Sequence, residues 1–108
     1  KLNHYENKIA ILGDMFELGE KEIELHKNLS SSIIKNKVNV LLTVGDLMKN
    51  LSKEINNKNI FKKHFLNKED LKNFLMNFDF NNSAILIKGS RGMKMEEIVS
   101  TIEQKVKH

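Results

Sequence analysis

Three short runs of apolar residues along the chain each lead into a glycine turn. The runs are residues 9–12 before Gly13, residues 40–44 before Gly45, and residues 84–87 before Lys88 and Gly89. Uninterrupted apolar runs of this length, bounded by turn residues, are typical of strands that are buried on both faces in a parallel sheet. A fourth run, residues 60–65, predicts a further short strand, although Lys62 and Lys63 interrupt it.

Between these runs, apolar residues recur at the three- and four-residue spacing of amphipathic helices. The four sets are Ile23, Leu25, Leu29, Ile33 and Ile34; Leu47, Met48, Leu51 and Ile55; Leu71, Phe74, Leu75 and Phe78; and Met95, Ile98, Val99, Ile102 and Val106. Asp46 is predicted to cap the second helix, and Asn67 with Asp70 to form a capping box at the third. The alternation predicts an α/β fold with about four βα units, in which a Rossmann-like, open, mostly parallel sheet lies between two helix layers.

The three glycine turns are predicted to meet at one edge of that sheet, because the carboxyl ends of parallel strands lie together. Open α/β sheets bind ligands at this edge. The polar residues that would line it are Asp14, Asp46, Lys88, Ser90 and Arg91. Asp14 and Asp46 also have a structural interpretation, because Gly-Asp after a strand is ordinary turn and capping chemistry.

The turn formed by residues 89–92 (Gly-Ser-Arg-Gly) predicts a site for a carboxylate or a phosphate. Lys88 and Arg91 flank it, and the dipole and free N–H groups of the helix that follows would favour a negative charge there. Arg91 is the only arginine among the 108 residues. Its planar guanidinium suits a carboxylate better than a lysine does.

Composition excludes several classes of function. The 18 basic and 14 acidic residues give a net charge of +4, which is weak support for an anionic ligand, and the scattered lysines do not form a nucleic-acid-binding stripe. The absence of cysteine fits a cytoplasmic protein, and no apolar stretch reaches membrane-spanning length. The histidines (His4, His26, His64 and His108) lack metal-ligand spacing, and neither a triphosphate-binding loop nor a catalytic set is visible.

Two longer segments carry a resemblance to a known family. Residues 11–19 read Ile-Leu-Gly-Asp-Met-Phe-Glu-Leu-Gly, with His26 seven positions further on, and residues 85–96 read Ile-Leu-Ile-Lys-Gly-Ser-Arg-Gly-Met-Lys-Met-Glu. Both resemble signatures of the Mur ligases, in the carboxy-terminal domain of the members that add D-alanyl-D-alanine to UDP-N-acetylmuramoyl-tripeptide. The resemblance covers almost the whole chain and is weakest over residues 50–83.

The resemblance implies a cytoplasmic parent enzyme of peptidoglycan synthesis, an ATP-dependent carbon–nitrogen ligase that works through an acyl phosphate with Mg²⁺. It implies that Arg91, with Ser90 and the backbone near Gly89, holds the carboxylate of the dipeptide, while Lys88 points either there or at a phosphate. Asp14 and Glu17 would orient the dipeptide amine or meet the central ATPase domain. For His26, both a structural role and a role in the site remain open.

The chain also departs from that family. No Asp-x-Tyr-Asn-Ala-Asn-Pro loop precedes Ile9, and the UDP-sugar-binding domain and the ATPase domain that would bind ATP and Mg²⁺ are absent from the 108 residues. We therefore expect residues 1–108 to be one domain that lacks its first strand–helix unit and has no catalytic residue or activity of its own. Two alternatives remain at this point, a stand-alone flavodoxin-like or receiver-like binding domain and a protein-interaction module.

Overall fold

The computed structural model describes residues 7–14, 22–89 and 93–106. Within them, four parallel strands form one sheet in the order β3-β2-β1-β4. The strands are β1 (Asn7–Gly13), β2 (Val40–Val44), β3 (Phe61–Phe65) and β4 (Ser83–Lys88). The predicted open parallel sheet is confirmed, and the strand order, which the apolar pattern did not determine, places β1 and β2 at the centre.

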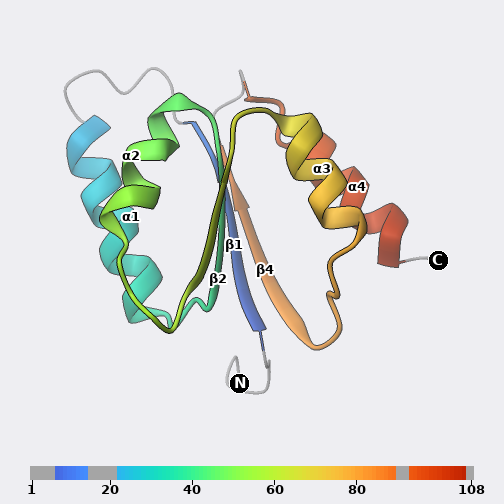
Figure 1. Cartoon of the computed structure of the whole chain (residues 1–108), viewed down its shortest axis with the longest axis horizontal. Coiled ribbons are helices and arrows are strands. Elements are labelled where there is room, and N and C mark those ends of the chain that lie inside the picture. Colours follow the sequence, from blue (N-terminus) through green and yellow to red (C-terminus); the bar gives the residue numbers. More distant parts are fainter. Residues whose placement is uncertain (1–6, 15–21, 90–92, 107–108) are drawn as a thin grey trace.

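The helices of the described chain cover the sheet from both sides, as predicted (Figure 1). They are α1 (Glu22–Lys35), α2 (Asp46–Glu54), α3 (Lys68–Met76) and α4 (Glu96–Val106). Figure 1 shows α1 and α2 on one face and α3 and α4 on the other. The result is the three-layer α/β/α arrangement.

Side chains of the two central strands alternate between two apolar clusters, as the period of two in a strand requires. Toward α3 and α4, the cluster contains Ile9, Ile11, Val40, Leu42, Val44, Phe65, Leu71, Leu75, Met95, Ile98 and Ile102. Toward α1 and α2, it contains Ala10, Leu12, Ile33, Leu41, Met48, Leu51 and Ile55. Continuous apolar runs therefore did mark strands that are buried on both faces.

The two outer strands differ from the central ones. β3 begins at Phe61, one residue later than predicted, and its lysines 62 and 63 are exposed. Charged side chains on such an edge strand discourage pairing with other chains. In β4, Leu86 keeps 49% of its surface exposed, so the prediction of burial on both faces is wrong for this strand. The cause is helix placement, because α2 packs on β2 and β3, and α1 packs against α2.

Candidate functional site

The carboxyl ends of β1 and β4 lie side by side, as the sequence predicted. Leu12 is in register with Lys88, so the turns that follow the two strands are neighbours. A Cβ atom added to Gly89 would lie 3.5 Å from the Cα atom of Gly13. The two segments that carry the family resemblance therefore meet at this point of the fold.

Met95 fills the space that the two glycines leave. A Cβ atom on Gly13 would approach Met95 Sδ to 2.7 Å, and one on Gly89 would approach Met95 Cγ to 2.5 Å. Met95 is buried in the cluster between the sheet, α3 and α4. Glycine at positions 13 and 89 thus lets a core methionine sit directly over the ends of two strands.

Asp14 caps a helix that belongs to another part of the chain. Its carboxylate Oδ1 accepts a hydrogen bond of 2.8 Å from the backbone N–H of Met48, in the first turn of α2, and only 4% of its surface is exposed. A carboxylate at this position also complements the positive end of the helix dipole. Asp14 therefore has a capping role, although the helix that it caps lies 34 residues further along the chain. Its role in substrate binding stays a prediction.

Asp46, in contrast, does not cap α2, and that prediction is wrong. It is the first residue of the helix, and the preceding cap position is Gly45, which has no side chain to bond the helix N–H groups. Gly45 has φ = 106°, and a Cβ atom there would lie 2.4 Å from Asp14 Cγ. The glycine is needed both for its backbone conformation and for the space that the Asp14 carboxylate occupies. At α3, by contrast, the predicted cap is present, because Asn67 Oδ1 accepts from the Asp70 N–H at 2.9 Å.

A threonine–histidine pair, which the sequence analysis missed, lies beneath α2. Thr43 Oγ1 and His64 Nδ1 are 2.7 Å apart, and within the described chain the buried Nε2 atom of His64 has no hydrogen-bond partner. Burial and the nearby Lys49 lower the pKa of His64, while Asp14 and Asp46 partly oppose this shift. The one available signal was Thr43 itself, a polar residue inside the apolar run of β2.

The beginning of α4 differs from the predicted anion site. The helix begins at Glu96, and the backbone N–H groups of Glu97, Ile98 and Val99 already donate to the carbonyl oxygens of Lys94 and Met95. These three N–H groups are therefore not free for a ligand. The anion site itself involves residues 90–92, which lie outside the described residues, and stays a prediction.

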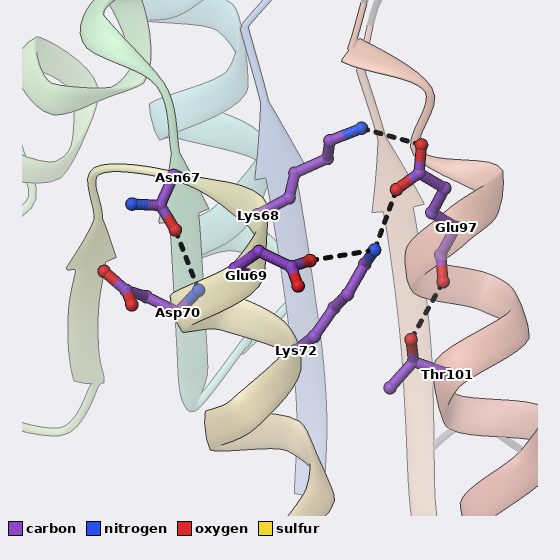
Figure 2. A network of polar contacts seen from close by, with 7 residues as sticks. All are labelled: Asn67, Lys68, Glu69, Asp70, Lys72, Glu97 and Thr101. Carbon is purple, nitrogen blue, oxygen red and sulfur yellow. Dashed lines mark hydrogen bonds and ion pairs between the residues drawn. The ribbon is translucent and has the colours of Figure 1, made fainter.

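An ion-pair network fastens the first turn of α4 to α3 (Figure 2). Glu97 lies 3.0 Å from Lys68 Nζ and 2.8 Å from Lys72 Nζ, and Lys72 also reaches Glu69 at 3.2 Å. The hydrogen bonds from Lys72 and then Lys68 lower the pKa of Glu97 to about 2. The network links the helix that follows the glycine turn to α3, and the sequence analysis did not predict it.

The predicted site residues are only partly within the described structure. Lys88 is exposed at the end of β4, and Gly89 follows it beside Met95 and Glu96 in a shallow pocket. Asp14 is on the neighbouring strand end but points to α2. Ser90, Arg91 and Glu17 lie outside the described residues, as does the side chain of His26.

Over residues 7–14, 22–89 and 93–106, no group of three or more His, Asp or Glu side chains is arranged to hold a metal ion. None of the helices described there is long and apolar enough to cross a membrane.

The chain is similar in sequence to curated ligases from several bacteria. The UDP-N-acetylmuramoyl-tripeptide–D-alanyl-D-alanine ligase of Buchnera aphidicola is 36% identical over 97 residues, which is 88% of this chain and 20% of that protein. The enzymes of the same name from Bacillus subtilis and Rickettsia prowazekii are 33% and 37% identical, over 94% and 87% of this chain and 22% and 21% of theirs. The chain thus spans about a fifth of the length of these relatives. No protein-family model matches it.

The fold is also that of a solved ligase. A crystal structure of MurF from Acinetobacter baumannii superposes with a TM-score of 0.70 at 22% identity, covering 92% of this chain and 22% of that one. A second crystal structure of the same protein gives a TM-score of 0.66. The structural likeness shows the fold, while the sequence likeness of the three curated enzymes shows the relationship. As a homologue of one segment of these UDP-N-acetylmuramoyl-tripeptide–D-alanyl-D-alanine ligases, the chain belongs to the Mur ligase family.

Proposed function

We propose that this chain is the carboxy-terminal, substrate-binding domain of a cytoplasmic ligase that joins D-alanyl-D-alanine to UDP-N-acetylmuramoyl-tripeptide in peptidoglycan precursor synthesis. The observation that carries the proposal is the meeting of the two resembling segments at Gly13, Gly89 and Met95. The names of the curated relatives support the same activity. The proposed domain comprises residues 1–108 and lacks the first strand–helix unit of the family's domain.

In the proposed reaction, the terminal carboxylate of the tripeptide takes the γ-phosphoryl group of ATP and becomes an acyl phosphate. The amine of the dipeptide attacks that carbonyl carbon, and the tetrahedral intermediate collapses to an amide as phosphate leaves, with ADP as the other product. Mg²⁺, when bound, would neutralise phosphate charge. As the family resemblance implies, we assign the binding of ATP and Mg²⁺ to other parts of the parent.

The role of this domain in that reaction is to bring in the dipeptide and to exclude water from the acyl phosphate. We assign the dipeptide carboxylate to Arg91, Ser90 and the backbone near Gly89, with Lys88 either beside them or facing a phosphate. Because Asp14 is buried and already bonded to α2, we assign direct contact with the amine to Glu17. Asp14 would act by holding the adjacent turn in place.

The proposal is tested by steady-state kinetics of the full-length parent enzyme. Replacing Arg91 by alanine removes a charge-assisted hydrogen bond, which costs about 1.5–3 kcal/mol. The KM for D-alanyl-D-alanine should therefore rise about tenfold to a hundredfold, with a much smaller change in the KM for ATP. Lys53→Ala, which removes an exposed cation from α2, serves as the control. An unchanged dipeptide KM in Arg91→Ala would place the carboxylate elsewhere.

We also propose that the isolated chain has no catalytic activity. Without the parts that bind ATP, the 108-residue chain should hydrolyse no ATP and form no amide. Measurable turnover of ATP by the purified chain would contradict the assignment of ATP binding to other parts of the parent.

A further inference from the structure

The first turn of α4 lies at the edge of the sheet where β1 and β4 end. Met95, which directly precedes α4, packs against Gly13 and Gly89 so closely that neither glycine has room for a methyl group. The carbonyl oxygen of Met95 accepts hydrogen bonds from the backbone N–H groups of Ile98 and Val99, at 2.9 and 3.2 Å. The position of Met95 over the two strand ends therefore depends on the position of the first turn of α4.

Glu97 lies in that turn and is bonded through both its backbone and its side chain. Its N–H donates to the carbonyl oxygen of Lys94 at 3.1 Å, and its own carbonyl oxygen accepts from the Thr101 hydroxyl at 3.0 Å. Its carboxylate accepts hydrogen bonds from Lys68 and Lys72 of α3, at 3.0 and 2.8 Å (Figure 2). Glu97 thus connects the first turn of α4 to α3.

These charged bonds constrain α4 in a way that its apolar contacts do not. Ile98 and Ile102 hold the helix in the core, but apolar burial has no preferred direction, whereas hydrogen bonds between charged groups require a defined geometry. The side chains of Lys68, Lys72 and Glu97 are between 23% and 39% exposed, and ion pairs in contact with solvent contribute little to the unfolding free energy. The network is therefore better suited to fixing the position of α4 than to supplying stability.

We propose that Glu97 is a positioning residue for the dipeptide site. Held by the two lysines of α3, it fixes the first turn of α4, so that Met95 keeps Gly89 in the arrangement that binds the carboxylate of D-alanyl-D-alanine. The inference rests on the proposed function, because it takes the backbone near Gly89 as part of the carboxylate site. Glu97 needs no contact with the substrate. Because Met95 fills the space beside Gly89, a shift of the helix start reaches that site directly.

Steady-state kinetics of the full-length parent enzyme test the proposal. Glu97→Gln keeps the size of the side chain and removes its charge, so the KM for D-alanyl-D-alanine should rise about threefold to thirtyfold. The KM values for ATP and for UDP-N-acetylmuramoyl-tripeptide should not change. Glu103→Gln, which removes an exposed carboxylate from the same helix, is the matched control. A purely structural role would reduce the amount of active enzyme, and hence the apparent kcat, without changing the dipeptide KM, and that result would overturn the proposal.

A double-substitution cycle tests whether Glu97 acts through α3. Lys72→Met removes the partner at 2.8 Å and should also raise the dipeptide KM. It leaves the pair with Lys68 in place, so it provides a second test if Glu97→Gln does not fold. If the two residues act together, the double variant should have a dipeptide KM no higher than that of Glu97→Gln alone. Increases that multiply in the double variant would show independent effects and would contradict the proposed connection to α3.

The activity of the unsubstituted parent separates this inference from the proposed function. A parent that does not join D-alanyl-D-alanine to the tripeptide overturns the proposed function, and the inference with it. An active parent whose dipeptide KM is unchanged by Glu97→Gln counts against the inference alone.

Discussion

The carboxylate of Asp14, at the end of β1, caps α2 through the backbone N–H of Met48, 34 residues further along the chain. The hydrogen bond connects the segment of residues 11–19 to α2, which packs on β2 and β3. Because the cap position of α2 is itself a glycine, Asp14 supplies the side-chain acceptor that the helix does not have locally. The stability of α2 therefore depends on the residue that follows β1.

Replacing Asp14 by alanine should destabilise the fold by about 1–3 kcal/mol, because a helix N–H loses its acceptor in a buried position. Asp46→Ala, which removes an exposed first-turn carboxylate, should cost less than about 1 kcal/mol. Urea-induced unfolding of both variants, followed by circular dichroism, gives the comparison. A larger loss in Asp46→Ala than in Asp14→Ala would restore Asp46 as the cap.

The contact of Gly89 with Met95 predicts a non-additive pair of substitutions. Gly89→Ala forces Met95 out of its position and should cost about 1–3 kcal/mol, as overpacking of a core does. Met95→Ala should cost about 2–5 kcal/mol through the cavity that it leaves. In the double variant the new methyl group has room, so its loss of stability should be smaller than the sum of the two single losses. Strict additivity in unfolding measurements would show that the two residues are not coupled.

Features that depend on neighbouring residues have recognisable signals in the sequence. The apolar runs located β1, β2 and β4, and the Asn67 cap was visible within four neighbouring residues. The capping of α2 was assigned to Asp46 because local chemistry favours it, whereas the actual bond joins Asp14 to Met48. Long-range relationships of this kind depend on strand order, which periodicity does not encode.

In the candidate site, too, some features could be predicted from the sequence and others could not. The meeting of the glycine turns could be predicted, because parallel strands end at one edge. The packing of Met95 over Gly13 and Gly89 could not, since it depends on how α4 returns to the sheet. The network of Glu97, Lys68 and Lys72 also depends on the packing of two helices that are separated by β4. The roles of Ser90, Arg91 and Glu17 stay predictions.

The ion pairs of Glu97 predict a pH dependence of stability. The pKa of Glu97 is about 2 in the folded chain against an ordinary value of 4.5, so the folded state favours the charged form. Its contribution to the unfolding free energy should be fully present above about pH 4.5 and should be lost as the pH falls toward 2. The difference in unfolding free energy between the native chain and Glu97→Gln should therefore shrink over this interval. Glu103→Gln, on the same helix but exposed, should show no comparable trend.

The Thr43–His64 pair predicts a second pH effect, in a higher range. The pKa of His64 is lowered from 6.5 by burial and by Lys49, so folding favours the neutral ring. The stabilisation should be fully present above pH 6.5 and should be lost as the pH falls through the lower, folded-state pKa. Protonation would make both ring nitrogens N–H donors, and the buried Nε2 atom has no acceptor in the described chain.

The test for His64 is the unfolding free energy measured from about pH 8 to about pH 5 for the native chain and for His64→Gln. The native chain should lose more stability on acidification than the variant does. Parallel pH profiles of the two proteins would mean that another group is responsible for the loss.

The strand order has a consequence for how the chain reaches its structure. β1 pairs on one side with β4, where Asn7 meets Ser83, so the sheet cannot close until residues 83–88 have left the ribosome. Contacts between such distant segments slow folding, because the closure of a long loop precedes the gain from the contacts. Until then, β1 of a nascent chain has one edge whose backbone N–H and C=O groups are unpaired, and strands of other unfinished chains can pair with it. The arrangement that places the two signature turns together thus makes the chain dependent on completing its synthesis without delay.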